Sequence, residues 1–379
     1  MNDDRSTKLA FLLGVGATLA LAAALTALAG WTVGLRDLLR TEPLASAPED
    51  DDSDGVDEHD LPELEPGTLR ELVDLGAVIE NAENPTGAVE HDTLLVRPDA
   101  GRGYALRAGV RVDAYMLSTG QALNLDPPVL HLPPEAPMSP DLRAYVGRNA
   151  RLHYSYGVDH LGFRRTLPEV ESTRKILMVG DSVLFGVGVD DDATLASALQ
   201  AQVGSAVQIV NAGVGGYGPD QIYAVAEELS SRGRYESLVY IACQNDFEDG
   251  SAETYLASAE RVLERLAGLA PRFEAGVTVL LVTAMEHTLY DVLRERGWTP
   301  LENDLTSHLR SGLPASAARH GFSYVDWAEF AERTSLLHGT LFHRFALYVD
   351  HVHLSPLGNR LAARELHRVL ARRGLGGGR

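Results

Sequence analysis

A run of apolar residues that ends in a serine constrains this chain more than any other feature. Residues Ile176 to Val179 are all apolar, and Gly180, Asp181 and Ser182 follow them directly. A continuous apolar run of this kind predicts a central strand of a parallel sheet, covered on both faces. Ligands of open α/β sheets bind beside the carboxyl ends of the strands. Ser182 is therefore predicted to lie where a ligand would bind.

Strand-like and helix-like segments alternate along the C-terminal half of the chain. Such alternation predicts a parallel sheet with helices on both faces. We therefore expect residues 172–373 to form a three-layer α/β/α domain with a parallel five-stranded sheet. The expected strands are Ile176–Val179, Val207–Val210, Ser237–Ala242, Val277–Val282 and Phe322–Val325, and the clearest expected helices are Pro219–Arg232, Glu253–Leu269 and Pro356–Arg373.

An uncharged segment follows a short polar tail, residues 1–8. Residues 9–35 contain no Asp, Glu, Lys or Arg, and a bilayer needs about 20 apolar residues. We predict a transmembrane helix, a signal anchor, over residues 9–35. The alternative is a signal peptide cleaved at Ala27-Leu28-Ala29, which would give a secreted protein. The segment is longer than the usual signal-peptide core of about 7–15 residues, which favours the anchor.

The chain is acidic, with 53 Asp and Glu against 33 Lys and Arg and a net charge of -20. This balance argues against nucleic acid as a partner. Part of the excess lies in residues 36–67, an acidic segment with several prolines that is predicted to be a disordered linker. Residues 374–379 are expected to be a flexible tail.

Residues 68–171 are predicted to form a small β-rich accessory region. A helical stretch, Leu69–Ile79, is expected first. Alternating segments that resemble short strands follow it. The proline-rich stretch Asp126–Pro140 is expected to be a surface loop. The expected strand-like segments include Thr93–Arg97, Tyr104–Met116 and Arg151–Tyr156.

Three further segments are predicted to approach Ser182. A glycine-rich stretch, Asn211–Gly218, follows the second strand, and its glycines let backbone N–H groups approach a ligand closely. Asn245 follows the third strand and offers an amide donor. Asp350 and His353 precede the last helix. Because serine needs a base and the base needs an orienting partner, this set indicates nucleophilic catalysis.

In this order the motifs resemble the SGNH hydrolases, also called the GDSL lipase and esterase family, over about residues 176–358. The resemblance implies an SGNH/flavodoxin-like fold, with Ser182 as nucleophile, His353 as general base and Asp350 as its orienter. It also implies an oxyanion hole made by the N–H groups of Ser182 and Gly216 and the Asn245 side chain, with Gly215 as the fallback for Gly216. Cys243 departs from the family pattern, which has glycine there.

The resemblance implies a serine esterase that hydrolyses or transfers an acyl group through an acyl-enzyme, without metal or cofactor. Anchored relatives act outside the cytoplasm, which implies an extracytoplasmic domain and an ester substrate, such as an acylated cell-envelope glycan or a small ester. The main alternative is a catalytically inactive, membrane-anchored interaction protein that keeps the fold. Two weaker alternatives are a dinucleotide site at Gly213–Gly218 and a metal site at Asp350, His351 and His353 with His343.

Overall fold

The computed structural model describes residues 66–80, 93–118, 127–243, 252–284, 305–331 and 346–376, all within one compact unit that spans residues 59–379. The predicted tail 1–8, the predicted anchor 9–35 and the linker up to residue 65 lie outside the described residues. Within the described ranges, no helix has the length and apolar character that a membrane span requires.

A parallel five-stranded sheet forms the C-terminal region, as predicted. Its strand order is β11-β10-β9-β7-β8, so the strand before Ser182 has a neighbour on each side. The ends agree with the expected ranges to within a residue or two, except that β8 runs three residues further. The strands are β7 (Lys175–Gly180), β8 (Gln208–Gly213), β9 (Ser237–Cys243), β10 (Val277–Val282) and β11 (Ser323–Asp326).

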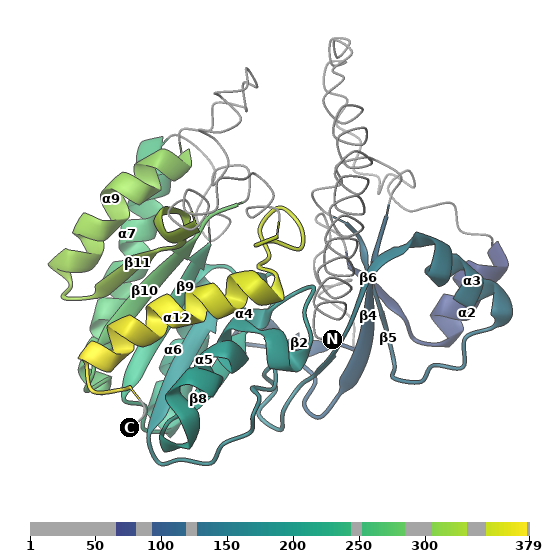
Figure 1. Ribbon diagram of the computed structural model, residues 1–379, viewed down its shortest axis with the longest axis horizontal. Coiled ribbons are helices and arrows are strands. Elements are labelled where there is room, and N and C mark those ends of the chain that lie inside the picture. The colour runs from purple at the N-terminus through teal and green to yellow at the C-terminus, as the bar shows by residue number, and fades with distance from the viewer. Residues whose placement is uncertain are drawn as a thin grey trace, which may run out of the picture. The chain divides into compact units, whose positions relative to one another are not determined.

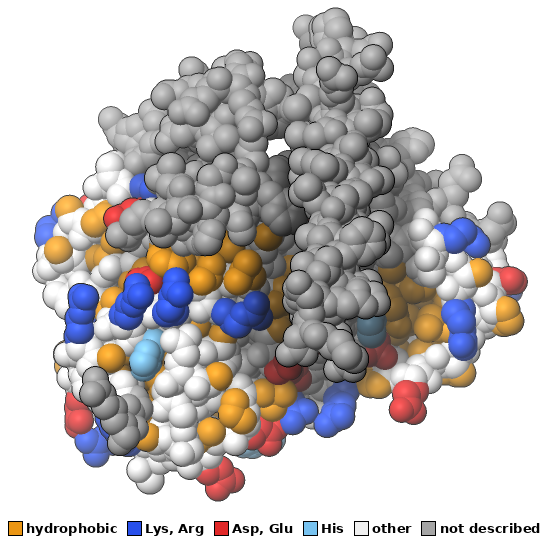
Figure 2. All heavy atoms as spheres, viewed as in Figure 1, with side chains coloured by type: hydrophobic (Ala, Val, Ile, Leu, Met, Phe, Trp, Pro, Cys, Tyr) orange, Lys and Arg blue, Asp and Glu red, His pale blue; other side chains and the backbone are white. Residues whose placement is uncertain are grey.

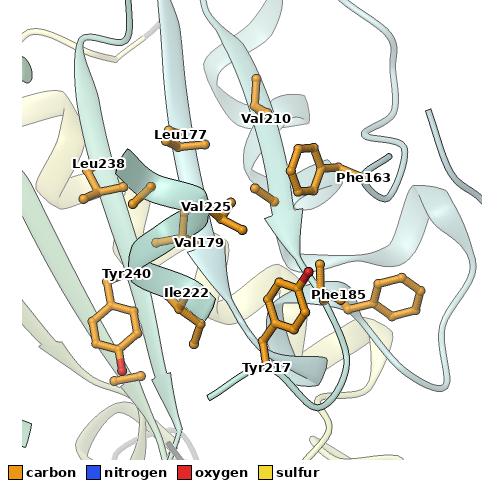
Figure 3. Close-up of a cluster of buried hydrophobic side chains, with 14 of the residues drawn as sticks. Phe163, Leu177, Val179, Phe185, Val210, Tyr217, Ile222, Val225, Leu238 and Tyr240 are labelled. Carbon is orange, nitrogen blue, oxygen red and sulfur yellow. The ribbon is translucent and has the colours of Figure 1, made fainter. Parts of the chain in front are cut away.

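Helices cover both faces of this sheet (Figure 1). On one face, Ile176 and Met178 of β7 pack in a cluster with side chains of α5 (Leu195–Val203) and α12 (Pro356–Arg372). On the other face, Leu177 and Val179 pack with side chains of α6 (Pro219–Arg232), α7 (Ala252–Leu269) and α9 (Leu305–Arg319). Figure 3 shows this second cluster between β7, β9 and α6. Because successive side chains point to opposite faces, a strand buried on both sides needs the unbroken apolar run seen in the sequence.

The last helix, α12, shows how the sequence specifies a helix that is half core and half surface. Its N-cap Ser355 accepts a hydrogen bond from the Gly358 N–H at 3.1 Å. Leu366 and Leu370 are buried on one side. A row of basic side chains lies on the exposed side (Figure 2), where the helix carries an arginine every four residues: Arg360, Arg364, Arg368 and Arg372.

The N-terminal region is β-rich, as expected. It contains a four-stranded antiparallel sheet of order β1-β5-β4-β6 and a separate hairpin, β2-β3. The strands are β1 (Val78–Glu80), β2 (Val96–Asp99), β3 (Gly103–Leu106), β4 (Arg111–Leu117), β5 (Val129–Leu132) and β6 (Ala150–Gly157), and the helices are α2 (Pro66–Asp74) and α3 (Pro140–Asn149).

Two expectations about this region are wrong. The stretch Asp126–Pro140 was expected to be a surface loop, yet Val129–Leu132 forms the buried strand β5 between β1 and β4. The neighbouring prolines flank the strand, so none of them has to donate to the ladder. The helix expected over Leu69–Ile79 begins earlier, at Pro66, and ends at Asp74, because the chain turns there into β1.

The two regions share one hydrophobic core. Tyr104, Met116 and Tyr156 of the N-terminal region belong to the same buried cluster as Val179 and Val210 of the parallel sheet. Elements from both regions therefore pack around the strand ends where a ligand is expected.

Candidate active site

Ser182 is the first residue of a short helix, α4 (Ser182–Phe185), directly after the central strand β7. The buried Asp181 caps this helix, and its carboxylate accepts a hydrogen bond from the Val183 N–H at 3.0 Å. The helix ends at Gly186, whose φ of 87° is a left-handed value that glycine adopts at no steric cost. The sharp turn from strand to helix leaves Ser182 half-buried at the carboxyl end of β7.

Arg164 holds the far end of α4, a role that the sequence did not reveal. Its guanidinium donates to the carbonyl oxygens of Phe185, Gly186 and Val189 at 3.2, 2.7 and 2.5 Å. It also pairs with the Asp191 carboxylate at 3.0 Å, although none of its side chain is exposed. A buried charge is retained only with such partners. No local signal marks this role, because a second arginine, Arg165, follows directly and Asp159 and His160 stand close before it.

The end of β8 packs directly against α4. Gly213 lies opposite Gly180 in the parallel register, and a Cβ atom on Gly213 would come within 2.5 Å of the Phe185 amide nitrogen. Asn211, a second residue that sequence reasoning missed, donates to the Leu184 carbonyl at 3.2 Å and accepts from the Gly213 N–H at 3.0 Å. The glycine-rich loop is thereby held beside the serine turn.

A tight turn over residues 214–217 presents two backbone N–H groups. The Tyr217 N–H donates to the Val214 carbonyl at 3.2 Å, and Gly216 has a φ of 72°. A positive φ at the third position alone is the signature of a type II turn. Within the described part of the chain, the N–H groups of Gly215 and Gly216 donate to no acceptor. Both are therefore available to a ligand.

The other N–H groups of this loop are already used, which counts against a dinucleotide site. The Val214 N–H donates to the Gly180 carbonyl at 3.3 Å, and the Gly218 N–H donates to the Gln221 side chain at 2.8 Å. A pyrophosphate would need several of these groups at once. The first glycine of the motif is explained by its close contact with α4.

His353 and Asp350 form a closely coupled pair. The His353 Nδ1 atom lies 2.7 Å from the Asp350 carboxylate, whose other oxygen accepts the N–H groups of Val352 and His353 at 3.0 and 2.8 Å. Burial raises the pKa of Asp350, but the charge and hydrogen bonds of His353 outweigh burial and hold the pKa below its ordinary value. The carboxylate is therefore ionised at neutral pH and can only accept. Nδ1 must carry the proton, and in the neutral ring Nε2 is then the basic nitrogen.

The segment that carries this pair contributes to the same buried cluster as the serine turn. Val352 and Leu354 belong to the same buried cluster as Val183 and Leu184 of α4. The Asn359 side chain of α12 donates to the Ala193 carbonyl at 3.0 Å, which links the last helix to the loop after α4. Segments that are distant in sequence, one with Ser182 and the other with His353, thus share one buried cluster.

Other predicted site residues have different outcomes. Asn245 and His343 lie outside the described residues, so the amide role and the four-residue metal site stay predictions. Among the residues that are described, no three or more His, Cys, Asp or Glu side chains are grouped closely enough to hold a metal ion. Cys243, the departure from the family pattern, ends β9 and is fully buried in the cluster beneath α5 and α12.

The parallel sheet and its two layers of helices define a three-layer α/β/α protein. Residues 176–366, slightly more than half of the chain, match the family GDSL-like Lipase/Acylhydrolase. The chain belongs to this family and is an ester-bond hydrolase. The resemblance seen in the sequence is thus confirmed at the level of the family.

Solved structures show similarity over about half of the chain. A member of the lipolytic protein G-D-S-L family from Veillonella parvula DSM 2008 is 18% identical with a TM-score of 0.39, over 52% of this chain and 99% of its own. A putative arylesterase from Agrobacterium tumefaciens str. C58 is 19% identical with a TM-score of 0.38, over 53% and 99%. An acetylxylan esterase from Geobacillus stearothermophilus is 19% identical with a TM-score of 0.38, over 52% and 93%. No curated protein matches the chain.

Proposed function

We propose that this protein is a serine esterase that uses Ser182, His353 and Asp350 as a catalytic triad. The Ser182 hydroxyl oxygen attacks the ester carbonyl carbon while His353 Nε2 takes its proton. The tetrahedral intermediate collapses, the C–O bond to the alcohol breaks, and His353 returns the proton to the departing oxygen. Water, activated by the same nitrogen, then attacks the acyl-serine and releases the acid.

The developing negative charge on the carbonyl oxygen needs fixed donors. We assign this role to the N–H groups of Ser182 and Gly216, with the Asn245 amide as a third donor. The unused Gly216 N–H beside the serine turn supports this assignment. Donors that are held in place before the reaction stabilise the intermediate without reorganisation, and removal of one typically costs about 10²–10³ in rate.

The observation that carries the proposal is the hydrogen bond between Asp350 and His353. The carboxylate that accepts from the ring is buried and is itself held by two backbone N–H groups, which distinguishes the pair from an ordinary ion pair on the surface. This arrangement fixes both the ring orientation and the tautomer, which are the two properties that a general base requires.

A fluorophosphonate probe tests the proposal directly on the full-length protein. Wild type should gain one adduct by intact mass, and peptide mapping should locate it on Ser182. Ser182→Ala should gain none and should lose hydrolysis of p-nitrophenyl acetate. The matched control is Ser205→Ala, because Ser205 is exposed and precedes the amino end of β8, whereas the candidate site lies at the carboxyl ends of the strands. An adduct on Ser182→Ala, or an unlabelled wild type that is folded, would overturn the triad.

We also propose that residues 9–35 anchor the protein in a membrane with the catalytic domain outside the cytoplasm. The length of the uncharged segment supports the anchor. The proposed substrate class is an acylated cell-envelope glycan or a small ester, and the acyl group passes to water or to a second hydroxyl. Protease protection of intact cells tests the location, and product analysis with and without a glycan acceptor tests the acceptor. Digestion only after lysis would contradict the orientation.

A further inference from the structure

The hairpin β2-β3 contacts the turn that carries Gly216 through two hydrogen bonds and the start of helix α6 through a third. The Tyr104 hydroxyl donates to the Gly215 carbonyl at 2.6 Å, and the Tyr217 hydroxyl donates to the Tyr104 carbonyl at 2.6 Å. The Gln221 side chain donates to the Arg102 carbonyl at 3.1 Å. The N-terminal region therefore reaches into the candidate site, outside the residues that match the family.

The two tyrosines form a buried unit. Each ring is 3% exposed, and the ring centroids lie 5.1 Å apart in an edge-to-face arrangement. Figure 3 shows the Tyr217 ring inside the cluster with Ile222 and Phe185. Burial raises the pKa of Tyr217 to about 12, so its hydroxyl stays protonated and can donate. The hydroxyl of Tyr104 is thereby delivered to Gly215 from a fixed position.

The Gly215–Gly216 peptide is the part of the turn that most needs such a constraint. It is the central peptide of the turn over 214–217, and turns of types I and II differ by the orientation of this one peptide plane. Both residues that flank it are glycines, which accept positive and negative φ about equally. The turn by itself therefore discriminates weakly between the two orientations.

The hydrogen bond from Tyr104 selects one orientation. In a planar trans peptide the C=O and the N–H point in opposite directions. A hydroxyl that holds the Gly215 carbonyl on the side of the hairpin consequently holds the Gly216 N–H on the other side. The same bond withdraws electron density from the carbonyl and makes the N–H of that peptide a stronger donor.

We propose that Tyr104 is a positioning residue for the oxyanion hole: it fixes the Gly215–Gly216 peptide so that the Gly216 N–H faces the charge that develops on the substrate. This inference rests on the proposed esterase function. The N-terminal region then takes part in catalysis, because the Tyr104 side chain that orients the Gly216 N–H lies outside the residues that match the family.

The test compares Tyr104→Phe with Tyr217→Phe in the full-length protein. Each variant keeps its ring and loses one 2.6 Å hydrogen bond between the same two segments. Only Tyr104→Phe frees the Gly215–Gly216 peptide. We expect its kcat for p-nitrophenyl acetate to fall about 10- to 100-fold, part of the loss typical of a missing donor, with KM within about twofold of wild type. The loss in Tyr217→Phe should be several-fold smaller at a similar unfolding midpoint.

Inhibition by a trifluoromethyl ketone gives a second readout, because the ketone binds as a tetrahedral oxyanion adduct. Its Ki should rise in Tyr104→Phe by about the factor by which kcat falls. Equal losses of kcat in the two variants, or a kcat of Tyr104→Phe near wild type, would overturn the positioning role while Ser182→Ala remains inactive. If wild type and Ser182→Ala hydrolyse equally, the esterase proposal itself fails and the inference falls with it.

Discussion

At the scale of single residues, the Asp350 carboxylate determines what His353 can do. Because the ionised carboxylate only accepts, it leaves the ring with its proton on Nδ1. An amide in the same place could instead donate to Nδ1 and move the proton to Nε2. In the proposed triad the ring would then be unable to take the proton of Ser182, although its position would hardly change.

Asp350→Asn is therefore expected to lower kcat by up to about 10⁴ with a small effect on folding. Steady-state hydrolysis of p-nitrophenyl acetate measures the loss, and circular dichroism confirms the fold. Asp192→Asn is the matched control, since Asp192 is an exposed aspartate. A loss below tenfold in Asp350→Asn would mean that another group orients His353.

The same carboxylate makes the stability of the protein depend on pH. Its pKa is lower in the folded chain than the ordinary value of 3.8, so the unfolded chain binds the proton first as the pH falls. The stability that this group contributes is complete above that ordinary value and is lost as the pH falls through the folded pKa. Denaturant unfolding of wild type and Asp350→Asn should show a difference in the free energy of unfolding that shrinks below about pH 4. A constant difference down to the acid transition would contradict the shifted pKa.

At the scale of elements, α4 is too short to hold its own position and depends on Arg164. Four residues make at most one turn, and an isolated turn is unfavourable. The buried guanidinium supplies the missing hydrogen bonds to the carbonyls that follow the helix and neutralises Asp191.

Arg164→Ala should lower the free energy of unfolding by about 3–5 kcal/mol, because it leaves the mostly buried Asp191 carboxylate without its charged partner and three carbonyl oxygens without their donor. Arg165→Ala is the matched control, because Arg165 is the next residue in the chain and its guanidinium pairs with the exposed Glu169. Such surface pairs contribute about 0.2–1 kcal/mol to the free energy of unfolding. Urea unfolding followed by tryptophan fluorescence measures both. Similar losses in the two variants would contradict the role of Arg164.

Two glycine substitutions, one at the contact between β8 and α4 and one in an open part of helix α3, should have opposite effects on stability. Gly213→Ala places a Cβ within 2.5 Å of the Phe185 amide and should cost about 1–3 kcal/mol and impair hydrolysis. In helix α3, Gly147 has open space around its Cβ position, so Gly147→Ala should stabilise by about 0.5–1 kcal/mol and leave kcat unchanged. Thermal unfolding and kcat together check both expectations; a tolerated Gly213→Ala would mean that α4 can shift.

The elements also show what sequence patterns can and cannot predict. The central strands β7, β9 and β10 were predictable, because burial on both faces imposes a nearly unbroken apolar run. The edge strand β11 is only partly buried and was predictable from its place in the alternation of strands and helices. Strand β5 was not, since its four residues lie between prolines that usually indicate a loop. Local motifs were enough to predict Ser182, Asp350 and His353 as site residues. The partners Arg164, Asn211 and Tyr104 act through contacts between distant parts of the chain, which no local pattern records.

At the scale of the molecule, residues that support the candidate site lie outside the part of the chain that matches the family. The matched residues begin at Ile176, whereas Arg164 and Tyr104 precede them and hold the serine turn and the glycine turn. The shared cluster adds apolar contact between β8 and the N-terminal region. The predicted boundary between residues 171 and 172 separates Arg164 and Tyr104 from the segments to which they are hydrogen-bonded.

A comparison of two shortened proteins, residues 66–379 and residues 172–379, tests this dependence. The longer protein keeps every described element and should match the full chain in unfolding midpoint and kcat. The shorter one exposes Val210 and Tyr217 to water and loses the Arg164 contacts, so it should bind a hydrophobic dye, unfold at lower urea and lose most of its kcat. Because the triad itself is present in both, any difference belongs to the N-terminal region. Equal midpoints and equal kcat values would show that the catalytic domain folds and functions without it.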